Sequence, residues 1–242
     1  MSQTTRQDQK AKPGPPDVLI LGGGRFGRLA GRRLAGRVLA LAELNPQPGL
    51  EELGAPVWAL AAVPAALQAL ASQQPPAWIV PCIPQHFLAH WLLASLGPSD
   101  PRLLPVPQAL EPGLPVLGRG PEGQLYLSIT DTLCPDDCPE PAQACPKTGQ
   151  PRGEPLFARL AALSLPGWGV AVLRSHQLAP GVGGLAVSEM LALRQRLAGQ
   201  GGDWLVGTAC RCHGVLHGLA LAPTVAAFNK NGTSKQYVPH TE

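Results

Sequence analysis

Five of the six cysteines fall into two short segments whose side chains could bind a metal. In the first segment each cysteine is followed by proline, and the second has the order Cys-Arg-Cys-His. Thiolate and imidazole ligands favour zinc, copper(I) or iron–sulfur over magnesium or calcium. We therefore expect a metal centre, either a 4Fe-4S cluster or zinc. The candidate ligands are Cys134, Cys138, Cys145, Cys210, Cys212 and His213.

The spacing of these cysteines leaves other interpretations open. C-x3-C and C-x6-C match neither the usual zinc knuckle nor the common ferredoxin run. A redox-labile disulfide beside a free thiol, or a cysteine-rich surface loop without a ligand, are the alternatives. Cys82 stands apart in an apolar run and is expected to be a small buried hydrophobe. His86 and His90 share one predicted helix face, where they either bind a metal or are helix surface or core residues.

A glycine-rich turn is the second candidate site. Gly22, Gly24 and Gly27 fit G-x-G-x-x-G between an apolar run and a helix-like segment, a context typical of pyrophosphate binding. Glu43 ends the next apolar run about 20 residues on, where a carboxylate binds ribose hydroxyls and repels a 2′-phosphate. We therefore expect an adenine dinucleotide, NAD(H) rather than NADP(H). The predicted contacts are Gly22, Gly24, Arg25, Phe26, Gly27, Glu43 and Asn45. The alternative is a glycine turn that binds no nucleotide.

The same segment resembles a known family. Val18-Leu-Ile-Leu-Gly-Gly-Gly-Arg-Phe-Gly27, with Ala42-Glu43-Leu44-Asn45 and Leu50-Glu51-Glu52-Leu53, is similar to the RCK (regulator of potassium conductance) group and the N-terminal domain of TrkA-type potassium-uptake regulators. The resemblance covers residues 17 to about 96 and implies a Rossmann fold that binds NAD(H), often in a homodimer. The chain has Leu60-Ala61 where the group usually carries Gly-Asp. The glycine turn is also similar to that of the dehydrogenase that makes sirohydrochlorin from precorrin-2.

The elements that must position these residues predict an α/β fold. We expect a Rossmann-like doubly wound parallel sheet, a smaller C-terminal α/β portion and a Cys/Pro-rich loop. The predicted strands are 17–21, 37–44, 57–60, 77–82, 103–106, 125–129, 169–174 and 204–208, and the predicted helices are 28–35, 65–72, 85–96, 154–163 and 187–198. Residues 181–184, three of them glycine, are expected to form a flexible connection.

The organisation along the chain follows from composition. We expect a disordered tail at 1–16, a dinucleotide-binding domain at 17–110, a Pro/Gly/Cys-rich connection at 111–153, a C-terminal α/β portion at 154–228 and a loose tail at 229–242. A net charge of +3 without long basic runs gives no reason to expect nucleic acid. With no signal-like start and no apolar stretch long enough for a membrane span, we expect a cytoplasmic protein.

The residues favour an NAD(H)-binding protein with a cysteine-ligated metal centre, acting in redox sensing, nucleotide-state sensing or electron transfer. One alternative is an NAD-dependent dehydrogenase, an oxidoreductase of a small molecule or tetrapyrrole. His176 and Asp131 follow predicted strands and are its candidate acid and base groups. The other alternative is a non-catalytic RCK-like regulatory module.

Overall fold

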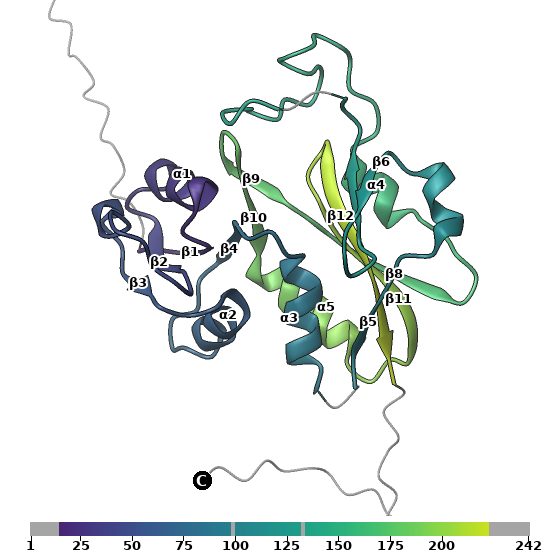
Figure 1. The fold of residues 1–242 in the computed structure, drawn as a ribbon, viewed down its shortest axis with the longest axis horizontal. Helices are drawn as coiled ribbons and strands as arrows, with labels where there is room; N and C mark the ends of the chain where they lie inside the picture. The colour runs from purple at the N-terminus through teal and green to yellow at the C-terminus, as the bar shows by residue number, and fades with distance from the viewer. Residues whose placement is uncertain (1–14, 98–99, 132–133, 223–242) are drawn as a thin grey trace, which may run out of the picture.

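The chain forms a mixed α/β structure built on two six-stranded sheets (Figure 1). The computed structural model describes residues 15–97, 100–131 and 134–222. Most of the predicted tails, 1–16 and 229–242, therefore lie outside the described residues. Within the described residues, the helices are too short or too polar to cross a bilayer.

The first sheet holds the glycine turn and has the strand order β3-β2-β1-β4-β10-β9. Its parallel strands are β1 (Val18–Leu21), β2 (Val38–Ala42), β3 (Val57–Trp58) and β4 (Trp78–Pro81), and its antiparallel strands are β9 (His176–Ala179) and β10 (Val182–Ala186). At the end of β1, Leu21 is in register with Ala42 on one side and with Pro81 on the other. The turns after β1 and β4 therefore meet at one edge of the sheet.

The second sheet has the order β6-β7-β12-β11-β8, and β5 also pairs with β12. Its strands are β5 (Arg102–Leu104), β6 (Val116–Arg119), β7 (Leu125–Ser128), β8 (Trp168–Arg174), β11 (Gly202–Ala209) and β12 (His213–Leu221). Among the described strand pairs of this second sheet, β8 and β11 are parallel and the others are antiparallel. After β8, the chain crosses at Ser175 from the second sheet into β9 of the first.

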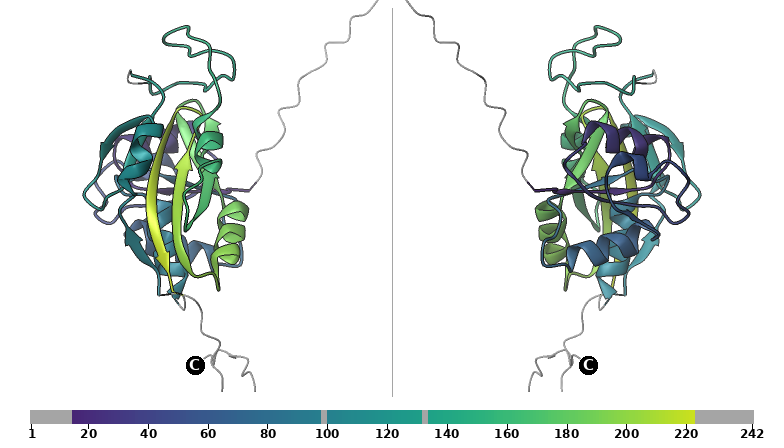
Figure 2. Two further views of the ribbon diagram at one scale, coloured as in Figure 1. Left: turned by 90° about the vertical axis from the view of Figure 1, so that its right-hand side faces the viewer. Right: turned by 90° about the vertical axis from the view of Figure 1, so that its left-hand side faces the viewer.

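The helices fill the space between and beside the sheets, as Figures 1 and 2 show. They are α1 (Arg25–Arg33), α2 (Ala62–Leu70), α3 (Phe87–Ser95), α4 (Leu156–Ala161) and α5 (Val187–Leu197), with short 3-10 helices η1 (Glu51–Leu53) and η3 (Gln108–Gly113). Helices α1 and α2 cover opposite faces of β1, whose four residues are all buried. The fully buried Leu88 and Trp91 of α3 belong to a core that also contains α5 residues and both sheets.

The structure differs from the predicted parallel sheet in its second half. The C-terminal strands form a separate, mostly antiparallel sheet, and β9 and β10 return to the first sheet as antiparallel strands. The flexible connection predicted at 181–184 is wrong, because Val182, Gly183 and Gly184 belong to β10. An antiparallel edge on a parallel sheet needs no long crossover, so a short hairpin suffices to extend it.

Candidate functional site

The glycine turn lies between the ends of β1 and β4. Gly22 has a φ of +104°, and a Cβ there would come within 2.6 Å of the Cys82 carbonyl oxygen. A Cβ on Gly27 would overlap the Gly22 carbonyl oxygen. A Cβ on Gly24, in contrast, would meet no described atom within 4 Å. The protein's own packing therefore requires glycine at positions 22 and 27 but leaves the space above Gly24 open.

Glu43 directly follows β2, the strand beside β1, and its side chain is hydrogen-bonded to the glycine turn. Its carboxylate accepts a hydrogen bond from the Gly23 amide at 2.8 Å and from the Asn45 amide at 3.1 Å. These two amides lower the pKa of the Glu43 carboxyl, first Gly23 and then Asn45. Glu43 is therefore an ionised carboxylate at the glycine turn, and Asn45 contributes through its backbone.

Two arginines of helix α1, which follows the glycine turn, contact the first cysteine segment. Arg25 pairs with Asp136, and its guanidinium lies 5.4 Å from the centre of the Phe26 ring, which is 55% exposed. Arg33 donates to the carbonyl oxygens of Asp136 and Pro180. Arg25 therefore faces the cysteine segment in this structure, so its predicted phosphate contact requires it to leave Asp136.

Both cysteine segments contribute to one cavity of about 350 Å³. Five of the six predicted ligand side chains belong to its lining or border it: Cys134, Cys138, Cys210, Cys212 and His213. Phe26, next to the glycine turn, also lines this cavity. The fold therefore brings residues that are about 80 positions apart in the sequence to one place, beside helix α1.

His213 lies between two thiols. Its Nε2 is 3.7 Å from Cys134 Sγ, and its Nδ1 is 3.9 Å from Cys210 Sγ. The amides of Cys212 and His213 donate to Cys210 Sγ at 3.4 and 3.3 Å. Burial raises the pKa values of Cys134 and Cys210 and lowers that of His213. A neutral imidazole is the form that binds a metal, whereas the thiols must release protons to do so.

Two of the three remaining predicted ligands, Cys212 and Cys145, have environments that differ from each other. Arg152 donates to Cys212 Sγ at 2.9 Å, but burial outweighs this charge and raises the pKa of Cys212 to about 11. Cys145 lines a separate cavity of about 620 Å³ that also contains Thr148 and Arg152. The Thr148 hydroxyl, followed by the amides of Thr148 and Lys147, lowers the pKa of Cys145 to about 7.

All six cysteines are free thiols. Among the described residues, no three His, Cys, Asp or Glu side chains are grouped closely enough to hold an ion. Cys82, which was expected to be buried, is only partly buried against the core beside β1, and desolvation raises its pKa to about 12.

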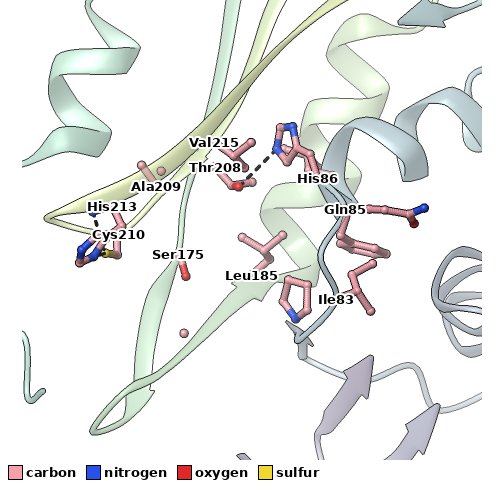
Figure 3. Close-up of a pocket in the computed structure, with 15 residues that line it drawn as sticks. Ile83, Gln85, His86, Ser175, Leu185, Thr208, Ala209, Cys210, His213 and Val215 are labelled. Carbon is pink, nitrogen blue, oxygen red and sulfur yellow. Dashed lines mark hydrogen bonds between the residues drawn. The ribbon is translucent and has the colours of Figure 1, made fainter. Parts of the chain in front are cut away.

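A third group of polar residues surrounds a cavity of about 370 Å³ between the two sheets, shown in Figure 3. His86 and Thr208 stand on one side of it, and Cys210 and His213 on the other (Figure 3). His86 is 3% exposed, and its Nε2 lies 3.3 Å from the Thr208 hydroxyl. His86 is therefore both a core residue and part of a cavity wall.

Three neighbouring cavities share Gly183 of β10 as a lining residue. They are the Figure 3 cavity, the cysteine cavity and a cavity of about 500 Å³ that is also lined by Phe26 and Cys82. Of the predicted acid and base groups, Asp131 lines the Cys145 cavity. His176 lines none of these cavities and is hydrogen-bonded to Glu189 at 3.1 Å.

Sequence reasoning missed the Figure 3 cavity, although it noted His86. The C-x2-H spacing of Cys210 and His213 could have indicated that these two residues form one site. As in a C-x2-C knuckle, the short turn directs two backbone amides, those of Cys212 and His213, to the Cys210 sulfur.

The fold and the site together define a mixed α/β protein with a glycine turn and a cysteine–histidine cavity. Residues 88–222 match the family described as AF_1314_C: Uncharacterized protein, C-terminal domain. This match covers more than half of the chain, and the chain belongs to that family. No curated protein and no solved structure matches the chain. The family region contains the residues of the cysteine cavity that were predicted to bind a metal, but it begins after the glycine turn, so the resemblance to the RCK group stays a prediction.

Proposed function

We propose that this protein binds NAD(H) at the glycine turn and a metal ion at the neighbouring cysteine–histidine cavity. The observation that carries the proposal is the stereochemistry of the turn. Gly22 and Gly27 are required by packing, whereas Gly24 faces open space at the start of α1. A pyrophosphate that approaches the backbone explains why glycine stands at a position where the protein alone would accept a side chain.

The strand order supports this reading. Strands β3, β2, β1 and β4 are parallel and adjacent in that order, as in the first half of a Rossmann domain. Ligands of open α/β sheets bind where the strand order reverses, which here is between β1 and β4. The first turn of α1 has no acidic residue and no side-chain N-cap bond, so a phosphate would meet no competing carboxylate from the helix itself.

Glu43 supports NAD(H) over NADP(H). Its carboxylate is fixed by two amides and is ionised at neutral pH. Each of its oxygens retains acceptor capacity for a ribose hydroxyl. A 2′-phosphate at the same place would be repelled by the negative charge. We therefore expect NADH to bind more tightly than NADPH, and Glu43→Gln to reduce that preference.

The test of nucleotide binding is calorimetry with NADH on Gly24→Ala. The backbone at Gly24 (φ −70°) suits alanine, so the melting temperature should stay unchanged while affinity falls about tenfold or more. Gly118→Ala is the matched control, because a Cβ on this β6 glycine also meets no described atom within 4 Å. Equal NADH affinity in both variants, or no binding by the wild type, would refute the proposal.

The metal half of the proposal rests on the distance between Cys134 and His213. Two ligands of one tetrahedral zinc, at about 2.3 Å for sulfur and about 2.1 Å for nitrogen, lie about 3.6 Å apart. The observed separation of Cys134 Sγ and His213 Nε2 is 3.7 Å. This separation favours a single ion such as zinc over an iron–sulfur cluster. Cys138 and Cys210 line the same cavity. Cys210 Sγ lies beside the other ring nitrogen of His213, Nδ1, so it would join the set only after a rearrangement of the site.

Metal analysis of anaerobically purified protein tests this half separately. We expect bound zinc in the wild type, its loss in Cys134→Ser and His213→Gln, and its retention in the control Cys82→Ser. A brown protein that contains iron and sulfide would instead support the cluster. A metal-free wild type that cannot be reconstituted with zinc or iron would refute the metal centre and leave nucleotide binding untouched.

A further inference from the structure

The Figure 3 cavity has an uncharged lining, unlike the neighbouring cysteine cavity. None of the described residues that line it is Asp, Glu, Lys or Arg. The cysteine cavity, in contrast, contains Asp136, Glu140 and Arg152. Transferring an ion into a cavity without a counter-charge carries a large desolvation cost. The lining therefore selects an uncharged occupant.

The walls of the cavity are mostly apolar. Ile83, Phe87 and Leu88 come from the β4–α3 connection and the start of α3, while Leu185 and Val215 come from β10 and β12. Figure 3 shows Ile83 and Leu185 on the side opposite Thr208. Most small-molecule sites combine such an apolar wall with a few polar groups that fix orientation. The occupant should therefore have an apolar body.

Thr208 supplies the orienting polar group. Its hydroxyl lies 3.3 Å from His86 Nε2, and His86 has no described partner at its other ring nitrogen, Nδ1. If Nε2 carries the imidazole proton, His86 donates to Thr208, and the hydroxyl hydrogen of Thr208 is directed to another acceptor. Ser175 presents a second hydroxyl to the cavity, on the link between β8 and β9.

We infer that this cavity binds an uncharged small molecule with an apolar body and a carbonyl oxygen, which accepts a hydrogen bond from the Thr208 hydroxyl. The cavity begins at Pro81, the last residue of β4, and at Ile83 just past it, and its far wall is Cys210 and His213. This inference deepens the proposed function. It rests on that function in one respect, namely that a dinucleotide bound at the glycine turn would lie beside this ligand. The binding itself needs no dinucleotide.

Ligand-observed NMR on the full chain without nucleotide tests the inference with three aromatic probes. Acetophenone has the carbonyl, ethylbenzene lacks it, and benzoate is a charged molecule of similar size. We expect acetophenone to bind more tightly than ethylbenzene and benzoate not to compete. In Thr208→Val, which keeps the side-chain shape, acetophenone affinity should fall about fivefold to tenfold. The control Thr148→Val removes a hydroxyl from the Cys145 cavity and should leave acetophenone binding unchanged.

The inference is overturned if acetophenone fails to bind the folded wild type, if Thr208→Val binds it as well as the wild type, or if benzoate binds equally. NADH calorimetry on the same samples separates this result from the proposed function. Acetophenone binding without NADH binding would refute the nucleotide proposal alone. NADH binding without acetophenone binding would refute the inference alone.

Discussion

Acidification should destabilise the fold through His86. The ring is almost completely buried, and its one hydrogen-bond partner among the described residues is the Thr208 hydroxyl. It stacks on the fully buried His217 at a centroid distance of 5.9 Å. His90 packs against His217 and is bonded to the Glu122 carboxylate at 3.1 Å. Burial, followed by the Coulombic effect of His217 and His90, lowers the pKa of His86 to about 3. Protonating this ring inside the fold is therefore unfavourable.

The size of the effect follows from proton linkage. In the unfolded chain the pKa of histidine is about 6.5, so between pH values of about 6.5 and about 3 the unfolded state binds one more proton than the folded state. The free energy of unfolding should fall by about 1.4 kcal/mol for each pH unit of acidification in this range. At a pH of about 4.5 the loss is about 3 kcal/mol, a large part of a typical total stability.

Urea unfolding of the wild type and His86→Gln at neutral pH and at a pH of about 4.5 measures this contribution. Glutamine stays uncharged and can still bond to Thr208, while the acid titration of the carboxylates is common to both proteins. We expect the wild type to lose about 3 kcal/mol more than the variant on acidification. Equal losses would refute the reasoning, as would an NMR titration in which folded His86 gains its proton near the ordinary histidine pKa.

Two further predictions concern the cysteine segments. In Gly181→Ala, the new side chain would strain a backbone φ of +68° and would also collide with the Asp136 carbonyl, so we expect weaker zinc binding. Gly199→Ala is the control, because this residue has a φ of +81° but open space around it, so the substitution should cause backbone strain alone. Zinc titration and melting temperatures of both variants distinguish the two effects. The Cys145 thiol should be half ionised at a pH of about 7, because the Thr148 hydroxyl stabilises the thiolate. Thr148→Val should therefore shift the pH midpoint of the Cys145 alkylation rate upward, which mass spectrometry of the labelled peptide measures. An unchanged midpoint would contradict the role of the Thr148 hydroxyl.

The glycine turn could be predicted from the sequence because its geometry is local. The conformation of Gly22 and the contact of Gly27 with the Gly22 carbonyl involve residues within six positions of each other. The Glu43 carboxylate lies against the turn as its spacing suggested, at 2.8 Å from the Gly23 amide. The helix–strand alternation over the first sheet likewise reflects local apolar patterns.

The cysteine cavity could be predicted only as a set of residues. Which thiols meet depends on the antiparallel pairing of β12 with β7, in which His213 is opposite Ser128. That register places His213 near Cys134, which follows β7 by a few residues, whereas Cys145 folds into its own turn with Thr148. Sequence spacing carries no information on such long-range registers, so it could not separate Cys145 from the other candidates.

The β9–β10 hairpin connects the two proposed sites mechanically. It contacts α1 through the Pro180 carbonyl, which accepts from Arg33, and it holds the cysteine segment through the Gly181 amide, which donates to the Cys138 carbonyl at 2.9 Å. Gln177 donates to the same Cys138 carbonyl at 2.6 Å. A displacement of α1 by a bound nucleotide would therefore reach the backbone of the cysteine segment through the hydrogen bonds of one hairpin. The glycines of this hairpin, which sequence patterns describe as flexible, instead permit the close contacts that make the connection tight.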